Sequence, residues 1–333
     1  MVPPQAGTGV PLAWRWADAG WGTILAVPAV IATAVDPALG IPLALGVLPA
    51  CILPLPAIRR ARVVYVIIGA LVGVSLLLGA LLAGLPAPVA ALVLAAIVMG
   101  AAAATARFRA GLLLLVLAAP LVGAGLSYGE NLAHAVGAAA LMTVGGAYAW
   151  LVALAWPAHA APPPAARAAP ALRPLLLYGV AIGIGAGIAY LVGVAAAMDH
   201  PGWAPAACLL VARPVAAQLE LRTVGRVVSV FLGALVALWL VSLELAPLAL
   251  ALVAGATVVG AAATRASRWY ITSAFTTLLV FLMLLLPEPA QATQKFSERL
   301  VETVLGAGLA VVFGVVLPSL VARGRVSATA GEG

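Results

Sequence analysis

The stretch RVVSVFLGALV at residues 226–236 repeats an earlier stretch of the same chain, RVVYVIIGALV at residues 62–72. Eight of the 11 aligned positions are identical, and the two copies are 164 residues apart. Asp36 with Pro37 precedes the first copy, and Asp199 with Pro201 precedes the second at nearly the same distance. The sequence therefore predicts two related halves, because self-similarity at a fixed offset is typical of internal repeats.

The composition predicts a membrane protein. Hydrophobic residues make up 65% of the 333 residues and charged residues only 8%, whereas soluble domains carry about 25% charged residues. Since a helical crossing needs about 20 apolar residues, the chain has room for about twelve crossings. We therefore expect an all-α polytopic membrane protein without a soluble domain.

Apolar runs fall into two sets of six on either side of a segment rich in proline and alanine. We interpret them as two direct six-helix repeats, which share one orientation because six is an even number of crossings. The predicted parts are a first repeat at 1–157 with an interfacial N-terminal segment, a cytoplasmic linker at 158–173, a second repeat at 174–325 and a disordered tail at 326–333. The predicted runs are 21–35, 40–57, 63–83, 86–105, 110–127, 132–157, 174–198, 202–217, 225–243, 246–264, 269–286 and 300–321.

The distribution of charged residues predicts the orientation. Arginines gather in alternate loops, for example Arg59 and Arg60, or Arg265 and Arg268, whereas the other loops carry mostly carboxylates. Positive loops lie on the cytoplasmic side, so we expect a multi-pass protein of the cell membrane with both termini cytoplasmic. The net charge of +7 is accordingly an orientation signal, with membrane lipids as partners, and not a nucleic-acid surface.

The sequence contains no motif of a known catalytic or cofactor site. It has no HExxH zinc motif, no phosphate-binding P-loop and no aspartate-rich loop. Cys51 and Cys208 lie in separate apolar runs, and the three histidines are dispersed. We therefore expect a protein that is not an enzyme, without catalytic residues, a metal or a cofactor.

Charged residues near membrane depth are the candidates for function, because burying charge in a bilayer is expensive. Arg213 precedes Pro214, so an interrupted helix beside a cation would suit an anionic substrate; the alternative is that Arg213 reaches the cytoplasmic headgroups. Arg222 and Arg226 share one helical face and would attract anions from the cytosol, or serve only as topology and lipid anchors.

Two further groups of residues lie at the predicted ends of the helices. Arg299 and Glu302 are three residues apart and can pair along one helix, either as a self-satisfied pair at the outer interface or as a proton-coupled gate. With Asp199 they form the candidate gating and coupling group. His200, Trp203 and Tyr270 join the three arginines 213, 222 and 226 as candidate substrate-binding residues, although an aromatic belt also explains Tyr270.

The second half resembles the fusaric-acid-resistance-like family of integral membrane transporters, which is related to aromatic acid exporters. The segment HPGWA at 200–204 and the Arg-Pro pair at 213–214 look like two of its motifs. Arg222 and Arg226 before Gly233 look like its paired arginines. The segments WYITSAFTTLL at 269–279 and RLVETVLG at 299–306 are similar to its later motifs.

This resemblance implies export of small organic, often aromatic, anions by a secondary transporter of the inner membrane that is driven by the proton gradient. Two alternatives stay open: a passive organic-anion channel, and a non-transporting scaffold or accessory subunit. A homodimer is also plausible, because small residues are abundant in the predicted helices.

Overall fold

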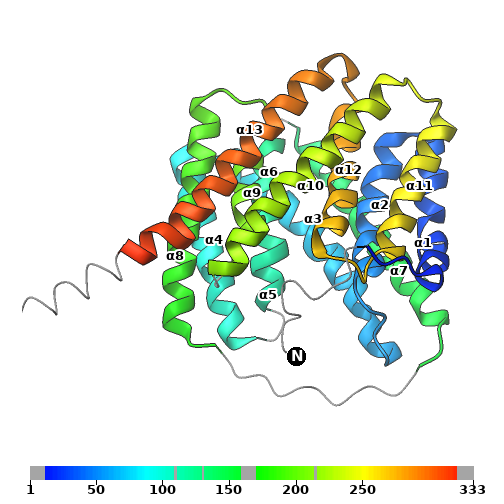
Figure 1. Ribbon diagram of the computed structural model, residues 1–333, viewed down its shortest axis with the longest axis horizontal. Helices are drawn as coiled ribbons and strands as arrows, with labels where there is room; N and C mark the ends of the chain where they lie inside the picture. The colour runs from blue at the N-terminus through cyan, green and yellow to red at the C-terminus, as the bar shows by residue number, and fades with distance from the viewer. Residues whose placement is uncertain (1–11, 109–110, 130, 159–169, 214–215, 321–333) are drawn as a thin grey trace, which may run out of the picture. The chain divides into compact units, whose positions relative to one another are not determined.

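A computed structural model describes residues 12–108, 111–129, 131–158, 170–213 and 216–320, without the side chains of 216–222 and of Trp269. Regular structure in these ranges is helical throughout (Figure 1). The longer helices of the first half are α1 (Trp16–Val35), α2 (Pro37–Ile52), α3 (Val64–Leu82), α4 (Ala87–Arg107), α6 (Ala119–Gly125) and α7 (Leu132–Ala155). Those of the second half are α8 (Leu172–Ala195), α9 (Trp203–Val211), α10 (Ala216–Ser242), α11 (Pro247–Ala263), α12 (Trp269–Leu285) and α13 (Ala292–Val311).

Shorter pieces complete the helical structure. The 3₁₀ turns are η1 (Arg59–Val63), η3 (Leu126–Tyr128) and η4 (Pro289–Gln291), and the short helix α5 spans Gly111–Leu113. Two π-helical turns, η2 (Leu114–Ala118) and η5 (Val312–Val316), lie within longer helical stretches. Such turns are rare in proteins, but those that occur often lie near functional sites.

Each predicted apolar run contains a helix, and the all-α membrane fold is confirmed. In the described ranges, 8 helices are long and apolar enough to cross a membrane. Three shorter apolar helices are also present, Pro37–Ile52, Pro247–Ala263 and Tyr270–Leu285. The prediction of about twelve crossings is therefore supported for eight of them.

The helix found in the run predicted at 202–217 is clearly shorter than a membrane crossing. This helix, α9, has only 9 residues and is thus about 14 Å long, less than half of a hydrocarbon core of about 30 Å. The helix ends at Val211, and Ala212 and Arg213 are not helical. Proline disfavours helical backbone in the residue before it, so the Arg-Pro pair at 213–214 accounts for this early end.

Local signals set other helix boundaries as well. The Asp36 side chain accepts a hydrogen bond from the backbone N–H of Ala38 at 2.8 Å and caps α2, whose first residue is Pro37. Pro247 likewise begins α11. Proline suits the first helical position because its missing N–H would have no partner there.

The structure divides into two compact units that do not coincide with the two predicted repeats. Unit 1 comprises Met1–Val74, Ala133–Arg167 and Val228–Glu298, and unit 2 comprises Ser75–Leu132, Ala168–Val227 and Arg299–Gly333. Each unit thus contains helices from both halves of the sequence. The boundaries predicted for repeats, linker and tail stay predictions, and most of the linker and the whole tail lie outside the described residues.

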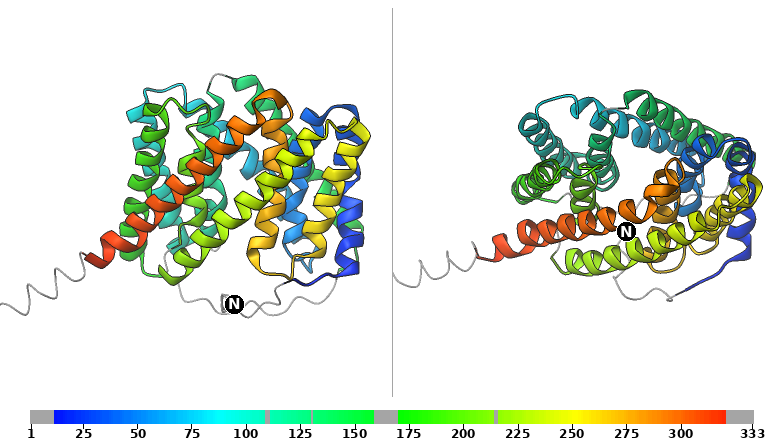
Figure 2. Two further views of the ribbon diagram at one scale, coloured as in Figure 1. Left: turned by 45° about the horizontal axis from the view of Figure 1, so that its top comes forward. Right: turned by 90° about the horizontal axis from the view of Figure 1, so that it is seen from above.

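In unit 1, α1 packs along α11 and against α2, and α2 also contacts α11 and α12 (Figure 2). At Gly145 of α7 an added Cβ would lie 2.6 Å from the carbonyl oxygen of Leu43 in α2, so these helices approach backbone to backbone. Glycine permits such contacts between membrane helices. The buried core of unit 1 is built around residues such as Leu25, Ile41, Val47, Leu279 and Phe281.

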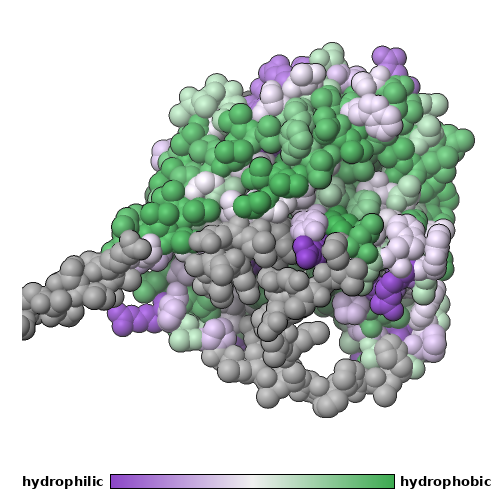
Figure 3. Space-filling view, viewed as in Figure 1, coloured by the Kyte–Doolittle hydropathy of each residue, from purple (hydrophilic) through white to green (hydrophobic). Residues whose placement is uncertain are grey.

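In unit 2, α4 packs along α8, and α9 lies against α6 and α8. Its buried core includes Leu94, Val98, Ile182, Cys208, Leu209 and Ala310. On the face drawn in Figure 3, apolar side chains cover most of the surface outside the grey segments. Such a surface suits contact with lipid, in agreement with a multi-pass membrane protein.

Candidate functional site: a buried charged cluster in unit 2

The inward face of α13 carries the candidate site. Arg299, Glu302, Thr303 and Gly306 lie at i, i+3, i+4 and i+7, which places them on one side of the helix, and all four are buried. An added Cβ at Gly306 would lie 2.1 Å from the carbonyl oxygen of Ala204, so this face packs directly on α9. The polar side chains of α13 in unit 2 therefore face the protein and not the lipid.

Arg299 and Glu302 form a buried ion pair. Nη1 of Arg299 lies 3.5 Å from Oε2 of Glu302, and their side chains are only 3% and 1% exposed. Removing two charges from water costs several kcal/mol for each ion, and their attraction must offset that cost. A buried pair is therefore weak evidence for stability, and at membrane depth ionisable groups are functional candidates by default.

Trp203, the first residue of α9, is the aromatic partner of this pair. The guanidinium carbon of Arg299 lies 4.0 Å from the Trp203 ring centroid, which is a cation–π contact. Trp203 is only 8% exposed, and its Nε1–H has no hydrogen-bond partner among the described residues. A buried donor without a partner costs about 1–3 kcal/mol, so the cluster presents one polar group that an acceptor would satisfy.

Arg226 adds a second guanidinium. It lies on α10, its side chain is half-buried and its Nε is shielded from solvent. It belongs to the same unit as Arg299. We call these four residues, Trp203, Arg226, Arg299 and Glu302, the charged cluster.

Arg226 and Arg299 belong to one compact unit, whereas the charge pattern placed them at opposite ends of the membrane. Both helices begin earlier than the apolar runs predicted. α10 begins at Ala216, which puts Arg226 about 15 Å into the helix. α13 begins at Ala292, which puts Arg299 about 10 Å into that helix. The arginines therefore lie inside the helices, and not at their ends.

Arg213 has a local role in the structure. Its Nη1 donates to the carbonyl oxygens of Ala212 and Leu210, at 2.5 Å and 3.3 Å. These carbonyls belong to the C-terminal end of α9, where the last four carbonyls of a helix lack intrahelical donors. A cation at this end also favours the helix dipole, so Arg213 stabilises the early end of α9.

Four other residues were predicted for the site: Asp199, His200, Tyr270 and Arg222. Asp199 is exposed and His200 is half-buried in the turn before α9. Tyr270 belongs to α12 of unit 1 and is half-buried. The side chain of Arg222 lies outside the described residues.

Unit 1 contains a buried arginine that serves a structural purpose. Arg62 is fully buried, and its guanidinium donates to the carbonyl oxygens of Ala153, Trp156 and Pro157 at 2.6, 2.7 and 2.9 Å. Its Nε donates to Pro56 at 3.0 Å. Arg62 therefore caps the end of α7.

Asp18 is a buried carboxylate that sequence reasoning missed, because it stands alone in a tryptophan-rich segment. Its Oδ1 lies 2.6 Å from Nη2 of Arg265, and its Oδ2 lies 3.5 Å from Nε of Arg15. Since Arg265 follows α11, this ion pair ties the start of α1 to the end of α11.

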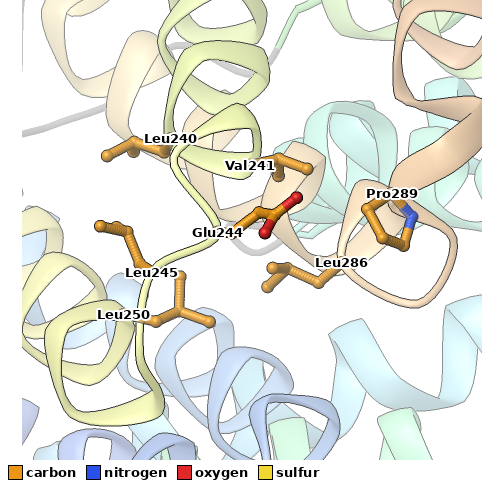
Figure 4. Close-up of a pocket in the computed structure, with 7 residues that line it drawn as sticks. All are labelled: Leu240, Val241, Glu244, Leu245, Leu250, Leu286 and Pro289. Carbon is orange, nitrogen blue, oxygen red and sulfur yellow. The ribbon is translucent and has the colours of Figure 1, made fainter.

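Unit 1 also has a pocket of about 260 Å³. It is lined by Leu240, Val241, Glu244, Leu245, Leu250, Leu286 and Pro289. Figure 4 shows the Glu244 carboxylate among these apolar side chains. Because a single carboxylate is the charged group in its lining, the pocket has no feature that would attract an anion.

The described residues contain no group of three or more His, Cys, Asp or Glu side chains placed to hold a metal ion. The arrangement in unit 2 instead combines two cations, one carboxylate and an indole N–H. Its chemistry suits an acceptor of hydrogen bonds that carries negative charge.

Comparison with known proteins agrees with the resemblance found in the sequence. Residues 178–313 match the family model described as "Fusaric acid resistance protein-like". The match runs from α8 into η5 and includes all four residues of the charged cluster. None of the curated proteins and none of the solved structures compared with the chain matches it.

Proposed function

With residues 178–313 established as a fusaric acid resistance protein-like region, we propose that the protein exports small organic anions across the cell membrane and binds them at the charged cluster. The observation that carries this proposal is the buried guanidinium of Arg299 on the ring of Trp203, 4.0 Å from its centroid. Family membership supports a membrane transporter or resistance protein; the substrate class and the direction of transport are parts of our proposal.

The donors of the cluster suit a carboxylate or sulfonate. Guanidinium groups bind such oxyanions through charge-assisted hydrogen bonds, and the Trp203 Nε1–H supplies a neutral donor beside them. An aromatic substituent on the anion would have an apolar environment, because α9 contributes buried alanines and Leu209. Small aromatic acids therefore fit the site better than hydrophilic anions.

The comparison between the units supports placing the site in unit 2. α1 packs along α11 in unit 1, and α8 along α4 in unit 2, which is the arrangement expected if α8 repeats α1 and α11 repeats α4. With an offset of 161 residues, Gly306 matches Gly145, and both glycines face the second helix of their own half. At this offset Arg299 and Glu302 match the uncharged Ala138 and Leu141.

The orientation in this proposal follows from the charge pattern, and the energy source follows from the resemblance to proton-driven exporters. We place both termini in the cytoplasm of a cell with an inner membrane, because the arginine-rich loops alternate with acidic ones. The proton gradient supplies the energy in this proposal. Asp199, which is exposed in the turn before α9, is the carboxylate that we assign to the proton step, since Glu302 is held by Arg299.

Transport from proteoliposomes tests the proposal. Radiolabelled benzenesulfonate is a suitable probe, because its sulfonate stays ionised and it does not leak as a neutral acid. Loaded vesicles with the wild-type protein should release it faster than protein-free vesicles, and an acidic exterior should accelerate the release. Arg299→Gln should abolish this release, whereas Arg60→Gln, at an exposed arginine of η1, should retain it. Equal release by wild type and Arg299→Gln would contradict the site, and no release by wild type would contradict the function.

A passive anion channel is the second candidate, and one observation favours it. Glu302, the buried carboxylate of the cluster, forms an ion pair with Arg299. It is therefore less available to bind and release a proton during transport. A channel predicts unitary currents in planar bilayers and release that follows the membrane potential but not the pH gradient. The transporter predicts no unitary currents and a dependence on the pH gradient.

A further inference from the structure

We propose that the pocket of unit 1 binds a small apolar organic cation, with the Glu244 carboxylate as its counter-ion. The pocket has a volume of about 260 Å³ and lies where α10 turns into α11, beside the end of α12 and the start of η4. All of its lining residues belong to unit 1, whereas the charged cluster belongs to unit 2. The site is therefore additional to the one proposed for anions.

The side chains that line the pocket are apolar except for one carboxylate. Leu240 and Val241 come from α10, Leu250 from α11, and Leu286 from the residue after α12. Figure 4 shows the Glu244 carboxylate on the side of its chain that faces Leu286. Ligand sites commonly combine an apolar lining with a few polar groups that fix the orientation of the ligand. This lining therefore suits a ligand with an apolar body and one cationic end.

The electrostatics at Glu244 favour a cation. Its carboxylate forms no ion pair with any residue that the structure describes, and Lys295, which follows η4, pairs with Glu288 at 2.9 Å. Glu244 also lies two residues after the end of α10 at Ser242. The C-terminal end of a helix carries partial negative charge, so it attracts cations and disfavours carboxylates. The helix end and the carboxylate therefore act in the same direction on a bound cation.

The backbone of Glu244 gives independent support for a role of its side chain. Its φ is 47°, in the left-handed region, which costs a residue with a side chain about 1–2 kcal/mol. Its N–H donates to the carbonyl oxygen of Val241 at 3.1 Å, an arrangement in which glycine commonly ends a helix. Glycine would adopt this backbone without strain. A glutamate thus occupies this position at a cost in stability, as occurs at binding sites.

The size of the pocket limits the ligand. Ligand sites usually enclose about 300–1,000 Å³, so a pocket of about 260 Å³ suits a molecule with one ring or a short chain. A matched pair of probes is 2-phenylethylammonium and 2-phenylethanol, which share the ring and the two-carbon chain. They differ at the end that would meet Glu244, where one carries an ammonium group and the other a hydroxyl group.

Titration calorimetry of the purified full-length protein in a neutral detergent tests the charge recognition. The wild type should bind the ammonium at least about tenfold more tightly than the alcohol. Glu244→Gln keeps the shape and removes the charge, so it should lower the affinity for the ammonium by about tenfold or more and leave that for the alcohol unchanged. Glu288→Gln, which changes a carboxylate that is 54% exposed, should keep the preference of the wild type.

A second pair of variants separates the binding role of Glu244 from its backbone strain. Glu244→Gly should raise the melting temperature, because it relieves the left-handed strain, and should abolish the preference for the ammonium. Ala197 is the matched control: it follows α8 with a φ of 51°, and its N–H donates to the carbonyl oxygen of Val194 at 3.0 Å. Ala197→Gly should also raise the melting temperature but leave the preference unchanged.

Several results would overturn the inference. They are equal affinity of the wild type for both probes, a preference for the ammonium that survives in Glu244→Gln or Glu244→Gly, and an equal loss of that preference in Glu288→Gln. A preference that only the two Glu244 variants remove is the result that we expect. Anion export plays no part in these measurements, so this inference and the proposed function can fail independently.

Discussion

Arg299 and Glu302 pair at 3.5 Å between Nη1 and Oε2 with both side chains buried, and the Arg299 guanidinium also lies 4.0 Å from the Trp203 ring centroid. A pair that served stability alone would be replaceable by apolar residues of similar size, often with a gain of about 1–4 kcal/mol. The buried charges in unit 2 therefore point to a ligand.

This view makes a prediction about stability and function in the same variants. Arg299→Met removes the guanidinium that lies beside the buried Glu302 and should lower the free energy of unfolding by about 3–5 kcal/mol. The double variant Arg299→Met, Glu302→Leu should regain most of that loss, because neither charge remains. Its anion transport should nevertheless be absent. Thermal unfolding and benzenesulfonate release measure the two effects, and a transport-competent double variant would refute the role of Arg299.

Trp203→Phe should weaken binding without weakening the fold. The ring that covers Arg299 is largely kept, and the donor that is lost has no partner among the described residues. Removing a buried unpaired donor is neutral or stabilising, whereas a hydrogen bond to an anion contributes about 1.5–3 kcal/mol. We therefore expect an unchanged or raised melting temperature and a Kd for benzoate raised by about tenfold or more.

A matched control exists in unit 1. Trp21 is buried to the same degree as Trp203, but its Nε1 donates to the carbonyl oxygen of Ala50 at 3.0 Å. Trp21→Phe should therefore cost about 1–3 kcal/mol of stability and leave the Kd for benzoate unchanged. If both variants lost stability alike and neither changed binding, Trp203 would be a packing residue.

The two arginines that begin the repeated stretch should respond differently to substitution. Arg62→Gln removes hydrogen bonds to four carbonyl oxygens and should lower stability by about 3 kcal/mol or more. Arg226→Gln should reduce benzoate affinity by about tenfold or more with a smaller effect on the melting temperature. Calorimetric unfolding together with benzoate titration distinguishes them, and the reverse pattern would contradict the assigned roles.

Two glycines of α13 provide a test of the packing on α9. A Cβ at Gly306 would lie 2.1 Å from the carbonyl oxygen of Ala204, whereas one at Gly308 would have no atom within 4 Å. Gly306→Ala should separate the helices, destabilise the protein by about 1–3 kcal/mol and impair anion binding. Gly308→Ala should stabilise it by about 0.5–1 kcal/mol, because glycine is a poor helix former. Equal effects of the two substitutions would show that α13 does not pack closely on α9.

The sequence predicted the helical fold and named the members of the cluster, but in two separate groups. It grouped Trp203 and Arg226 with the substrate and Arg299 and Glu302 with a gate. The residues AAQLELRTVG at 216–225 contain two charges, so hydropathy placed the start of the helix near Arg226, whereas α10 begins at Ala216. Because the helix begins about three turns earlier than hydropathy predicts, the sequence does not show that Arg226 lies well inside α10.

Contacts between segments that are far apart in the chain could not be predicted from one sequence. Asp18 and Arg265 are 247 residues apart, and no local spacing links them. The end of α9 was foreseeable from the Arg-Pro pair, but the return of the Arg213 guanidinium to the α9 carbonyls depends on side-chain geometry. Likewise, the sequence shows Arg62 as the first residue of the repeated stretch, but it does not predict that this side chain caps α7.

Structure determination with 4-iodobenzoate bound to the protein tests the central claim most directly, because iodine marks the ligand unambiguously. We predict that its carboxylate lies within hydrogen-bond distance, about 3 Å, of Trp203 Nε1 and of a guanidinium nitrogen of Arg299, with Glu302 still paired to Arg299. At a saturating concentration, iodobenzoate bound at another place with the cluster unchanged from its ligand-free arrangement would contradict the account.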